Sequence, residues 1–361
     1  MLKQSAGLCN WKSKVGGSIA KSLKVSNLPL SISAYDHEQV LEAAFAEKVI
    51  DRKLNSIDEA LESELIFLCL PLDASIAAFK EITPKLTEKN LLTDVCGVKS
   101  IFHKEWKECS SKGFFAGGHP MTGKEKGGFE NSDSLLFENS IYILTNEAKD
   151  FPGWNDFIEI LHSLGARVTF LTPKIHDMVV ASVSHLPQLV AVALINSANL
   201  KDSDVNFYDY AAGGFRDMTR IASSAFDIWE PIVRQNKDKI LSALSSFEEE
   251  LHEVRELITN GKLSFLAERF ESARIKRDEI PKNTKGMISQ LYDVFVYVKD
   301  QPGEISKIST ALFENNVNIK DMELLKIREG MGGTFRLAFS TKEEAVKAKK
   351  TIEAVGFSTK V

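Results

Sequence analysis

The feature that most constrains this fold is an alternation, between residues 30 and 172, of short apolar runs with segments of helical spacing. The run at 64–71, ELIFLCLP, is continuously apolar and ends at a proline, which is typical of a strand buried on both faces. The alternation favours a mostly parallel sheet with helices on both faces. The other strands of this sheet are predicted at 30–36, 90–97, 140–146 and 166–172.

Strand signals almost disappear between residues 173 and 288. The segment 175–198 is too apolar for a surface helix, and the segment 230–261 has apolar residues near helical spacing up to Gly261. A helical block with this much apolar surface is expected to bury part of it against a second copy of the chain. A homodimer is therefore predicted through this all-helical domain.

After the polar stretch 281–286, strand and helix patterns follow in the order βαββαβ, which is the order of a ferredoxin-like module. Thr341 and Glu344 have the spacing of a capping box, which predicts the start of its second helix. The chain therefore divides into three expected domains. They are a Rossmann-like α/β domain at 1–172, the helical domain at 173–288 and the ferredoxin-like domain at 289–361.

Composition excludes several classes of function. With 45 Lys and Arg against 50 Asp and Glu, the net charge is −5, so the chain lacks the basic footprint of a nucleic-acid-binding protein. No uninterrupted apolar run approaches the length of about 18 residues that indicates a membrane-spanning helix. The cysteines are isolated, which favours reduced thiols, a cytoplasmic location and no bound metal. They are Cys9, Cys69, Cys96 and Cys109.

The second half of the stretch 10–23, NWKSKVGGSIAKSL, has the pattern of the end of a dinucleotide-binding turn that enters a helix. Gly16 and Gly17 let a pyrophosphate approach the backbone, and a helix from Ser18 would direct its N-terminus at it. Asp36 ends the next predicted strand, where a carboxylate hydrogen-bonds the adenosine ribose and repels a 2′-phosphate. These residues predict a cofactor site that favours NAD over NADP.

The early part of this fingerprint is incomplete. In the frame G-x-G-x-x-G the first two glycines would fall at Trp11 and Ser13, and the preceding stretch SAGLCN is a poor strand. From these residues alone, a glycine-rich helix start in an unrelated fold explains the stretch as well as a cofactor site does.

The stretch 114–129, FFAGGHPMTGKEKGGF, is the most distinctive in the chain. His119 lies between glycines and Pro120, where no helix can run, and near the carboxyl edge of the predicted sheet, where ligands bind in open α/β folds. Two further polar motifs interrupt the helical block, SHLPQ at 184–188 and GGFRDMTRIASS at 213–224. An arginine on such a glycine-rich loop can bind a carboxylate through two hydrogen bonds.

Taken together, GGHPMTGKE at 117–125, SHLPQ and GGFRDMTRIASS resemble the motifs of prephenate dehydrogenases in order and spacing. The resemblance covers nearly the whole chain and implies a Rossmann domain followed by a helical dimerisation domain. KDQPGEI at 299–305 resembles the ligand loop of ACT domains, which some members of the family carry at this end. The implied reaction is the NAD-dependent oxidative decarboxylation of prephenate to 4-hydroxyphenylpyruvate in tyrosine biosynthesis.

The resemblance also implies roles for individual residues. His119 matches the histidine that hydrogen-bonds the substrate hydroxyl, and Arg220 matches the arginine that binds the substrate carboxylate. Thr122 and Glu125 are expected to shape the substrate pocket. For His176 and His185, pocket lining and a purely structural role both stay open. The remaining substrate-binding candidates are His185 and Gln188, and the cofactor-binding candidates are Gly16, Gly17, Ser18, Asp36 and Pro71.

The same resemblance implies that the third domain binds tyrosine as a regulatory ligand. The turn at 300–303 would direct backbone N–H groups of the following helix start at a carboxylate, and Gly303 would let the ligand approach the backbone. The alternative is a module that only adds dimer contacts. The regulatory candidates are Asp300, Pro302, Gly303, Asn316 and Asn318, the last two at the predicted start of the next strand.

Two departures from the family pattern leave the substrate open. Family members often have a serine where DVCGVK at 94–99 has Gly97, and a histidine where SHLPQ has Gln188. The carbonyl oxygen of a glutamine can accept a hydrogen bond from an ammonium group, which arogenate carries. Gln188 therefore leaves an arogenate or dual-specificity (cyclohexadienyl) dehydrogenase as one alternative. The incomplete glycine fingerprint leaves a second, a non-catalytic amino-acid-sensing protein with a degenerate nucleotide site.

Overall fold

The computed structural model divides the chain into two compact units, Met1–Phe270 and Glu271–Val361. The first unit contains the Rossmann-like domain and most of the helical domain, and the second contains the ferredoxin-like domain. The residues that the structure describes are 4–9, 14–26, 28–122, 127–145, 148–197, 201–202, 205–279, 291–328 and 332–360.

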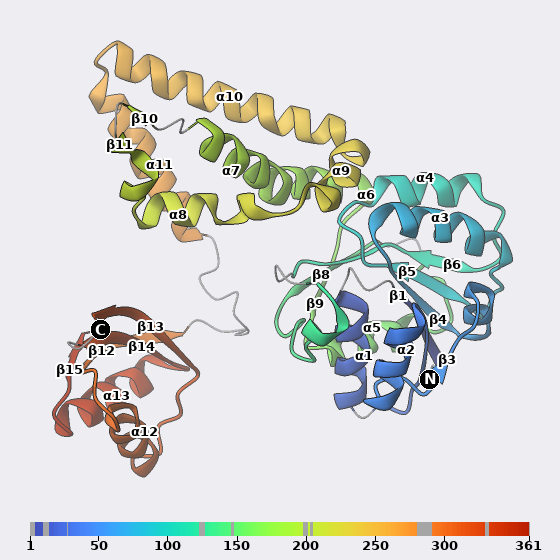
Figure 1. Ribbon diagram of the computed structural model, residues 1–361, viewed down its shortest axis with the longest axis horizontal. Coiled ribbons are helices and arrows are strands. Elements are labelled where there is room, and N and C mark those ends of the chain that lie inside the picture. Colours follow the sequence, from blue (N-terminus) through green and yellow to red (C-terminus); the bar gives the residue numbers. More distant parts are fainter. Residues whose placement is uncertain are drawn as a thin grey trace. The chain divides into compact units, whose positions relative to one another are not determined.

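The first unit is built on a six-stranded sheet in which all neighbouring strands pair in parallel (Figure 1). The strand order is β3-β2-β1-β4-β5-β6, so the connections reverse direction between β1 and β4. In open α/β sheets this reversal creates a ligand-binding crevice at the carboxyl ends of the strands. The strands are β1 (Gln4–Cys9), β2 (Ser31–Tyr35), β3 (Arg52–Lys53), β4 (Leu65–Cys69), β5 (Leu91–Asp94) and β6 (Phe114–Ala116).

The two faces of this sheet carry separate apolar cores, because alternate residues of a strand point to opposite sides. In β4, Leu65 and Phe67 pack into the core that includes α1 and α2, whereas Ile66 and Leu68 pack into the core that includes α3 and α4. All four side chains are buried, as the continuous apolar run predicts. The helices are α1 (Val15–Val25), α2 (Glu38–Ala46), α3 (Leu72–Ile82), α4 (Ser100–Glu108) and α5 (Trp154–Ser163).

Strand β1 corrects one expectation from the sequence. The stretch SAGLCN is a poor strand by composition, yet Gln4–Cys9 pairs with β2 on one side and β4 on the other, at the centre of the sheet. Strand propensity is a context-dependent preference, and pairing on both sides outweighs it here. The following helix begins at Val15 rather than Ser18, so Gly16 and Gly17 lie in its first turn.

The last two strands predicted for the parallel sheet do not extend it. They form a second sheet in the order β7-β8-β9, in which β7 is antiparallel to β8. A Cβ atom on Gly118 would come within 2.5 Å of the Asp94 carbonyl oxygen, so only a glycine lets the backbone cross the end of β5 and enter this sheet. The strands are β7 (Gly118–Pro120), β8 (Ile141–Leu144) and β9 (Arg167–Phe170).

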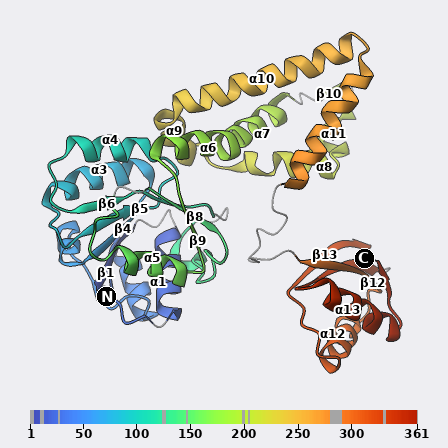
Figure 2. The ribbon, with the colours of Figure 1, turned by 180° about the vertical axis from the view of Figure 1, so that it is seen from behind.

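The helical domain opens with a continuous stretch, Pro173–Ser197, that contains one π-helical turn (Figure 2). The long helix predicted at 230–261 is wrong in one respect, because it is interrupted at Asn236, whose backbone leaves the helical conformation (φ −114°, ψ 23°). The elements are α6 (Pro173–Val180), η4 (Ala181–His185), α7 (Leu186–Ser197), β10 (Lys201–Asp202), β11 (Val205–Asn206), α8 (Gly213–Thr219), η6 (Arg220–Ser223), α9 (Phe226–Gln235), α10 (Lys237–Thr259) and α11 (Leu263–Glu279).

Pro173–Ser197 is the one stretch, among the residues that the structure describes, that is long enough and, with an 18-residue segment of mean hydropathy 1.9, apolar enough to cross a membrane by length and composition alone. Several of its polar side chains are nevertheless buried within the protein, namely His176, Asp177, His185 and Gln188. Large apolar side chains elsewhere in this domain are exposed in the single chain, such as Phe226 on α9 and Leu263 on α11. This exposed apolar surface favours a covering partner.

The second unit has the βαββαβ order predicted from the sequence. Its four strands form an antiparallel sheet in the order β13-β14-β12-β15, and α12 and α13 cover one face through a shared apolar core (Figure 1). Thr341 caps α13 by accepting a hydrogen bond from the Glu344 N–H at 3.1 Å, as predicted. The elements are β12 (Tyr292–Val298), α12 (Glu304–Glu314), β13 (Asp321–Arg328), β14 (Gly332–Phe339), α13 (Lys342–Ala354) and β15 (Ser358–Lys360).

Candidate active site

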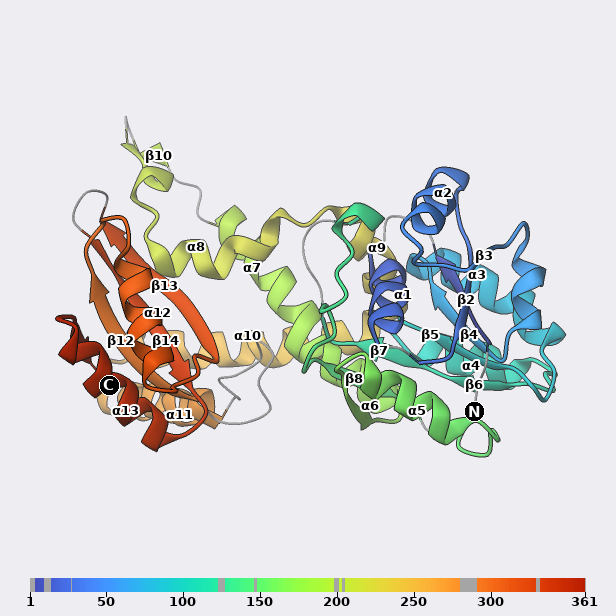
Figure 3. The ribbon, with the colours of Figure 1, turned by 90° about the horizontal axis from the view of Figure 1, so that it is seen from below.

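His119 lies in β7, which crosses the end of β5 at the carboxyl edge of the parallel sheet. Its Nδ1 atom is 2.9 Å from Nε2 of His176 in α6, and the two rings meet edge to face with centroids 5.1 Å apart. Figure 3 shows β7 and α6 side by side. His176 is fully buried, whereas His119 keeps part of its surface exposed. The histidine that the sequence singles out is thus paired with a second histidine from the helical domain.

Asp177 holds His176 from its other side. Its Oδ1 atom is 2.8 Å from Nδ1 of His176 and accepts a hydrogen bond from the Lys99 N–H at 2.8 Å, while Oδ2 accepts from the Ser100 N–H at 2.8 Å. Lys99 and Ser100 begin α4, where backbone donors and the helix dipole favour a negative charge. Burial raises the pKa of Asp177, but these hydrogen bonds outweigh burial and the net shift is downward. The carboxylate therefore stays ionised at neutral pH.

The histidines around this carboxylate are held in their neutral form. Burial of most of the ring, together with the neighbouring His176 and Lys99, lowers the pKa of His119 well below its usual 6.5. Burial also lowers the pKa of His176, although Asp177 opposes that shift. Burial lowers the pKa of His185 to about 4. A neutral, partly exposed imidazole at pH 7 can accept a proton, and His119 is placed to do so.

A buried ion pair fixes the strand that carries His119. The ammonium group of Lys99 pairs with the carboxylate of Asp94 at the end of β5. Asp94 also accepts from the N–H groups of Cys96 at 2.9 Å and Gly118 at 3.3 Å. Because a buried charge is costly without its partner, the end of β5, the start of α4 and the start of β7 are constrained to one arrangement.

One side of the His119 ring faces Gly97. A Cβ atom on Gly97 would lie 3.9 Å from both Cε1 and Nε2 of His119, which is ordinary van der Waals contact. Among the residues that the structure describes, Nε2 has no hydrogen-bond partner. The glycine that departs from the family pattern therefore leaves space directly beside this nitrogen.

His185 is enclosed by protein. The side-chain amide of Asn236 donates to the Asp177 carbonyl oxygen at 2.8 Å and lies 3.3 Å from Nδ1 of His185. The His185 ring also meets Trp229 edge to face, with centroids 6.0 Å apart, and the residue is 3% exposed. Of the two roles left open for His185, this environment favours the structural one.

The other substrate candidates lie on neighbouring segments. Thr122 donates from Oγ1 to a backbone carbonyl oxygen 3.1 Å away. Gln188 is buried and donates from Nε2 to the Ile221 carbonyl oxygen at 3.0 Å, so it holds the turn η6, which begins with Arg220. Arg220 is exposed in the single chain. Glu125 lies outside the residues that the structure describes.

Two of the cofactor candidates take part in packing that the sequence does not indicate. Ser18 is fully buried, and its hydroxyl oxygen accepts a hydrogen bond from the Asp133 N–H at 3.0 Å. A Cβ atom on Gly17 would come within 2.9 Å of the Phe129 ring. Gly17 and Ser18 thus allow α1 to pack closely against the segment 129–133.

The remaining cofactor candidates meet at one edge of the sheet. Asp36 directly follows β2, and Pro71 precedes α3 just beyond the end of β4. Gly16 lies in the first turn of α1, after the central strand β1, and this turn contains no acidic side chain. The candidates therefore surround the carboxyl ends of β2, β1 and β4, where the strand order reverses.

In the second unit, Asp300 and Pro302 lie in the turn that leads to Gly303, the N-cap of α12. Gly303 has a left-handed conformation (φ +87°), and a Cβ atom there would meet nothing within 4 Å. Asn316 and Asn318 were expected at the start of a strand, but β13 begins only at residue 321. Asn316 is itself left-handed (φ +51°), which ends α12 and delays the strand.

Four residues of the His119 network escaped the sequence analysis, and three of them had a signal. Asp94 and Lys99 bracket DVCGVK at the end of a buried strand, where charged side chains need a buried partner. Asp177 interrupts an otherwise apolar helix directly after His176. Asn236 gives no sequence signal, because its role depends on two distant partners.

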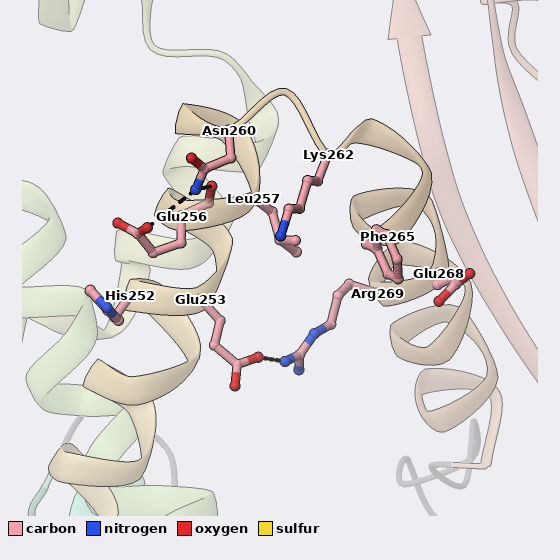
Figure 4. Close-up of a pocket in the computed structure, with 9 residues that line it drawn as sticks. All are labelled: His252, Glu253, Glu256, Leu257, Asn260, Lys262, Phe265, Glu268 and Arg269. Atoms are coloured by element: carbon pink, nitrogen blue, oxygen red, sulfur yellow. Dashed lines mark hydrogen bonds and ion pairs between the residues drawn. The ribbon is translucent and has the colours of Figure 1, made fainter.

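A separate groove lies between α10 and α11 (Figure 4). An ion pair between Arg269 and Glu253 spans it. The groove contains none of the predicted site residues, so it is not part of the candidate active site. Its lining residues are His252, Glu253, Glu256, Leu257, Asn260, Lys262, Phe265, Glu268 and Arg269.

The first unit matches two family descriptions in succession. Residues 19–170 match the family described as "Prephenate dehydrogenase, nucleotide-binding domain". Residues 172–272 match the family described as "Prephenate dehydrogenase, dimerization domain". The helical segment with His176 and Asp177 thus falls in the second description, and His119 falls in the first.

Individual relatives carry the same name as these two family descriptions. The chain is 32% identical over 349 residues to a prephenate dehydrogenase of Bacillus subtilis, with 94% of this chain and 93% of the relative covered. A crystal structure of a prephenate dehydrogenase from A. aeolicus, in complex with hydroxyphenyl propionate and NAD+, is 29% identical with a TM-score of 0.69, covering 78% of this chain and 99% of the other.

An arogenate dehydrogenase structure from Synechocystis is 26% identical with a TM-score of 0.67, covering 77% of this chain and 100% of the other. The two substrate names occur at nearly the same structural similarity, so the fold does not distinguish them. The Bacillus subtilis alignment, which covers 94% of this chain, and the two successive family descriptions confirm the resemblance seen in the motifs, and the chain belongs to the prephenate dehydrogenase family, whose members are NAD-dependent oxidoreductases.

Proposed function

We propose that the protein catalyses the NAD-dependent oxidative decarboxylation of prephenate to 4-hydroxyphenylpyruvate. The observation that carries the proposal is the neutral imidazole of His119, held by a buried histidine at the carboxyl edge of a Rossmann-ordered sheet. Such a group can accept the proton of a hydroxyl whose carbon gives up a hydride. The relatives named prephenate dehydrogenase support the choice of substrate.

The residues at the edge of the sheet fit NAD. The first turn of α1 has no acidic side chain to repel a pyrophosphate. Its backbone N–H groups belong to the end of the helix that follows the central strand β1. Asp36 ends β2, where a carboxylate binds the ribose and disfavours a 2′-phosphate. Bound NAD supplies a hydride acceptor. The protein's own residues position the substrate and handle its proton.

Nε2 of His119 takes the proton of the substrate hydroxyl as a hydride leaves the ring carbon that carries this hydroxyl. That carbon becomes a carbonyl carbon. The carbon–carbon bond to the ring carboxylate then breaks, carbon dioxide departs, and the electron pair enters the ring, which becomes aromatic. The phenolate oxygen takes the proton back from Nε2, so His119 ends neutral and the product is a phenol. The low pKa of His119 keeps its Nε2 atom available as an acceptor at pH 7.

Arg220 binds the substrate carboxylate in this proposal. The residue is exposed in the single chain, and the hydrogen bond from Gln188 to Ile221 fixes the turn from which it extends. A guanidinium binds a carboxylate through two parallel hydrogen bonds, which orients as well as attracts it. Thr122 and Glu125, in the same loop as His119, shape the pocket.

A second candidate substrate, arogenate, is favoured by Gln188. The Nε2 amide group of Gln188 is committed to Ile221, so its Oε1 atom is the part left to accept from an ammonium group. Comparing kcat/KM for prephenate and arogenate on the same preparation decides between the two substrates and a dual specificity.

The homodimer proposed from the sequence agrees with the exposed apolar side chains of α9 to α11. A second copy would cover this surface, and the family description of this domain refers to dimerisation. We therefore propose a dimer, and the isolated cysteines favour a cytoplasmic location for it. Sedimentation velocity at micromolar concentration should give a single species of twice the chain mass, and a monomer would contradict the proposal.

The ferredoxin-like unit is proposed to be an ACT domain that binds tyrosine at the turn before α12. The Bacillus subtilis alignment covers 94% of the chain, so it includes most of this unit. Gly303 at the start of α12 presents a backbone without a side chain, which lets an amino acid approach the N–H groups there.

Replacing His119 tests its role in the reaction. His119→Asn keeps a donor near the position of Nδ1 but removes Nε2, so kcat should fall about 10²- to 10⁴-fold while KM for prephenate changes little. Steady-state rates of NAD reduction measure both. His252→Asn on α10 is the matched control and should behave like the unmodified protein. An unchanged kcat in His119→Asn would remove this residue from the mechanism.

The pH dependence of kcat/KM tests the protonation state of His119. The groups that face it are His176, Asp177 and His185, with the Lys99–Asp94 ion pair nearby. Because the lowered pKa keeps the imidazole neutral above that value, His119 should cause no loss of kcat/KM between pH 6 and 8. The rate should fall only as the pH drops well below 6.5. An acid limb centred near 6.5 would contradict the assignment.

Replacing Arg220 tests carboxylate binding. Arg220→Ala should weaken prephenate binding about 10- to 100-fold, because a hydrogen bond to a charged group contributes about 1.5–3 kcal/mol. NAD affinity, measured by fluorescence titration, should stay nearly unchanged. Arg216→Ala removes the same charge one turn earlier in α8 and serves as the control. Equal losses for prephenate and NAD would argue against the assigned role.

Calorimetry on the full chain tests the regulatory site. Tyrosine should bind and lysine should not, and Gly303→Asn should weaken tyrosine binding at least about tenfold by placing a side chain over the backbone. Asparagine tolerates the left-handed conformation better than most residues, so the fold should survive. Gly356→Asn is the matched control, since Gly356 is also left-handed (φ +92°) and unencumbered. Equal tyrosine affinity in both variants would move the site elsewhere.

A further inference from the structure

His119 is the first of three side chains in the first unit that form a hydrogen-bonded chain, and the reaction described above assigns no role to the other two. His119 Nδ1 is 2.9 Å from His176 Nε2, and His176 Nδ1 is 2.8 Å from Asp177 Oδ1. His176 and Asp177 are 0% and 2% exposed. The far end of the chain is anchored by the N–H groups of Lys99 and Ser100, each 2.8 Å from the carboxylate. Each contact in this buried chain therefore has an identified partner on both sides.

The hydrogen-bonding roles along this chain follow from its anchored end. An ionised carboxylate only accepts hydrogen bonds, so Nδ1 of His176 carries a proton. A neutral His176 then has a lone pair on Nε2, so the atom opposite it, His119 Nδ1, is the donor. His119 is left with its lone pair on Nε2. The downward pKa shifts of Asp177 and His176 agree with an ionised carboxylate and a neutral ring.

The nitrogen with the lone pair is also the one on the edge of the ring that faces Gly97. Nε2 of His119 lies on the ring edge beside Gly97, where even a Cβ atom would stay 3.9 Å away. The opposite tautomer would place a proton on this edge and face a lone pair of His119 toward a lone pair of His176. The geometry thus permits one neutral tautomer, and that tautomer is the one able to accept a proton.

We propose that His176 and Asp177 are positioning residues that fix the Nε2-accepting tautomer of His119 and stabilise its positively charged form during the reaction. The proposal rests on the proposed function of His119. When Nε2 takes the substrate proton, Nδ1–H of His119 stays hydrogen-bonded to His176. Asp177 stays ionised and offsets the new charge through His176. No proton crosses to Asp177, and the proton on Nε2 returns to the product oxygen.

The alternative is that Asp177 only ties α6 to the start of α4, with His176 filling space between them. In that case the tautomer of His119 would not depend on His176. The two readings differ in what happens when the ring of His176 is replaced by groups of similar size that do or do not accept a hydrogen bond.

Histidine ¹⁵N NMR on the full-length protein without substrate tests the tautomer directly. His119 should be protonated on Nδ1 and unprotonated on Nε2 at pH 7. In His176→Phe, which has no acceptor, His119 should become a mixture of tautomers. In His176→Gln, whose Oε1 can take the place of Nε2, the original tautomer should persist. Protonation on Nε2 in the unmodified protein, or an unaltered tautomer in His176→Phe, would overturn the proposal.

Kinetics provide the second readout. His176→Phe should lower kcat about 10- to 100-fold, as for other residues that orient a reacting group, with KM for prephenate and NAD changed less than about threefold. His176→Gln should recover most of kcat. His162→Phe, on the exposed side of α5, is the control. A kcat in His176→Gln as low as in His176→Phe would reduce His176 to a packing role.

These outcomes separate the two proposals. If His119→Asn keeps full kcat, the assigned role of His119 fails whatever the NMR spectra show. If His119→Asn loses activity but His176→Phe keeps kcat and the tautomer, only the positioning role of His176 and Asp177 fails. The NMR measurement on the unmodified protein needs no variant to fold, so the tautomer assignment is tested in every case.

Discussion

The buried carboxylate of Asp177 joins the helical domain to the parallel sheet, and the arrangement around His119 depends on it. It meets two backbone N–H groups at the start of α4 and the ring of His176. Removing an ionised carboxylate from water is costly unless hydrogen-bond donors replace the water. The position of α6 against α4 is therefore set by directional bonds, and apolar packing alone would define it less sharply.

The same constraint extends to the strand that carries His119. Lys99 donates its N–H to Asp177 and pairs its ammonium with Asp94, and Asp94 accepts from the N–H of Gly118 at the start of β7. Each of these buried groups is satisfied only when the others are in place. The result is a rigid polar junction that holds the His119 ring with one edge toward Gly97, which suits a residue that must present one nitrogen to a substrate.

Much of the architecture was determined by the sequence. ELIFLCLP is apolar at every position, and a strand buried on both faces is the arrangement that uses such a run, as β4 does. The βαββαβ order of the C-terminal unit followed from alternating strand and helix periodicity. The motif around His119 identified the family together with SHLPQ and GGFRDMTRIASS, because glycines and prolines at short spacing reflect local backbone geometry that the chain encodes by itself.

Tertiary structure alone decided which distant residues meet. His119 and His176 are 57 residues apart, and Lys99 and Asp177 are 78 apart, yet they share one network. Hydrophobic periodicity reports which side of an element is buried, and it carries no information about the partner of a buried polar group. For the same reason SAGLCN, weak as a strand by itself, became the central strand β1 once two neighbours paired with it. Local pattern determined the elements and the motif, and directional contacts between elements decided the site.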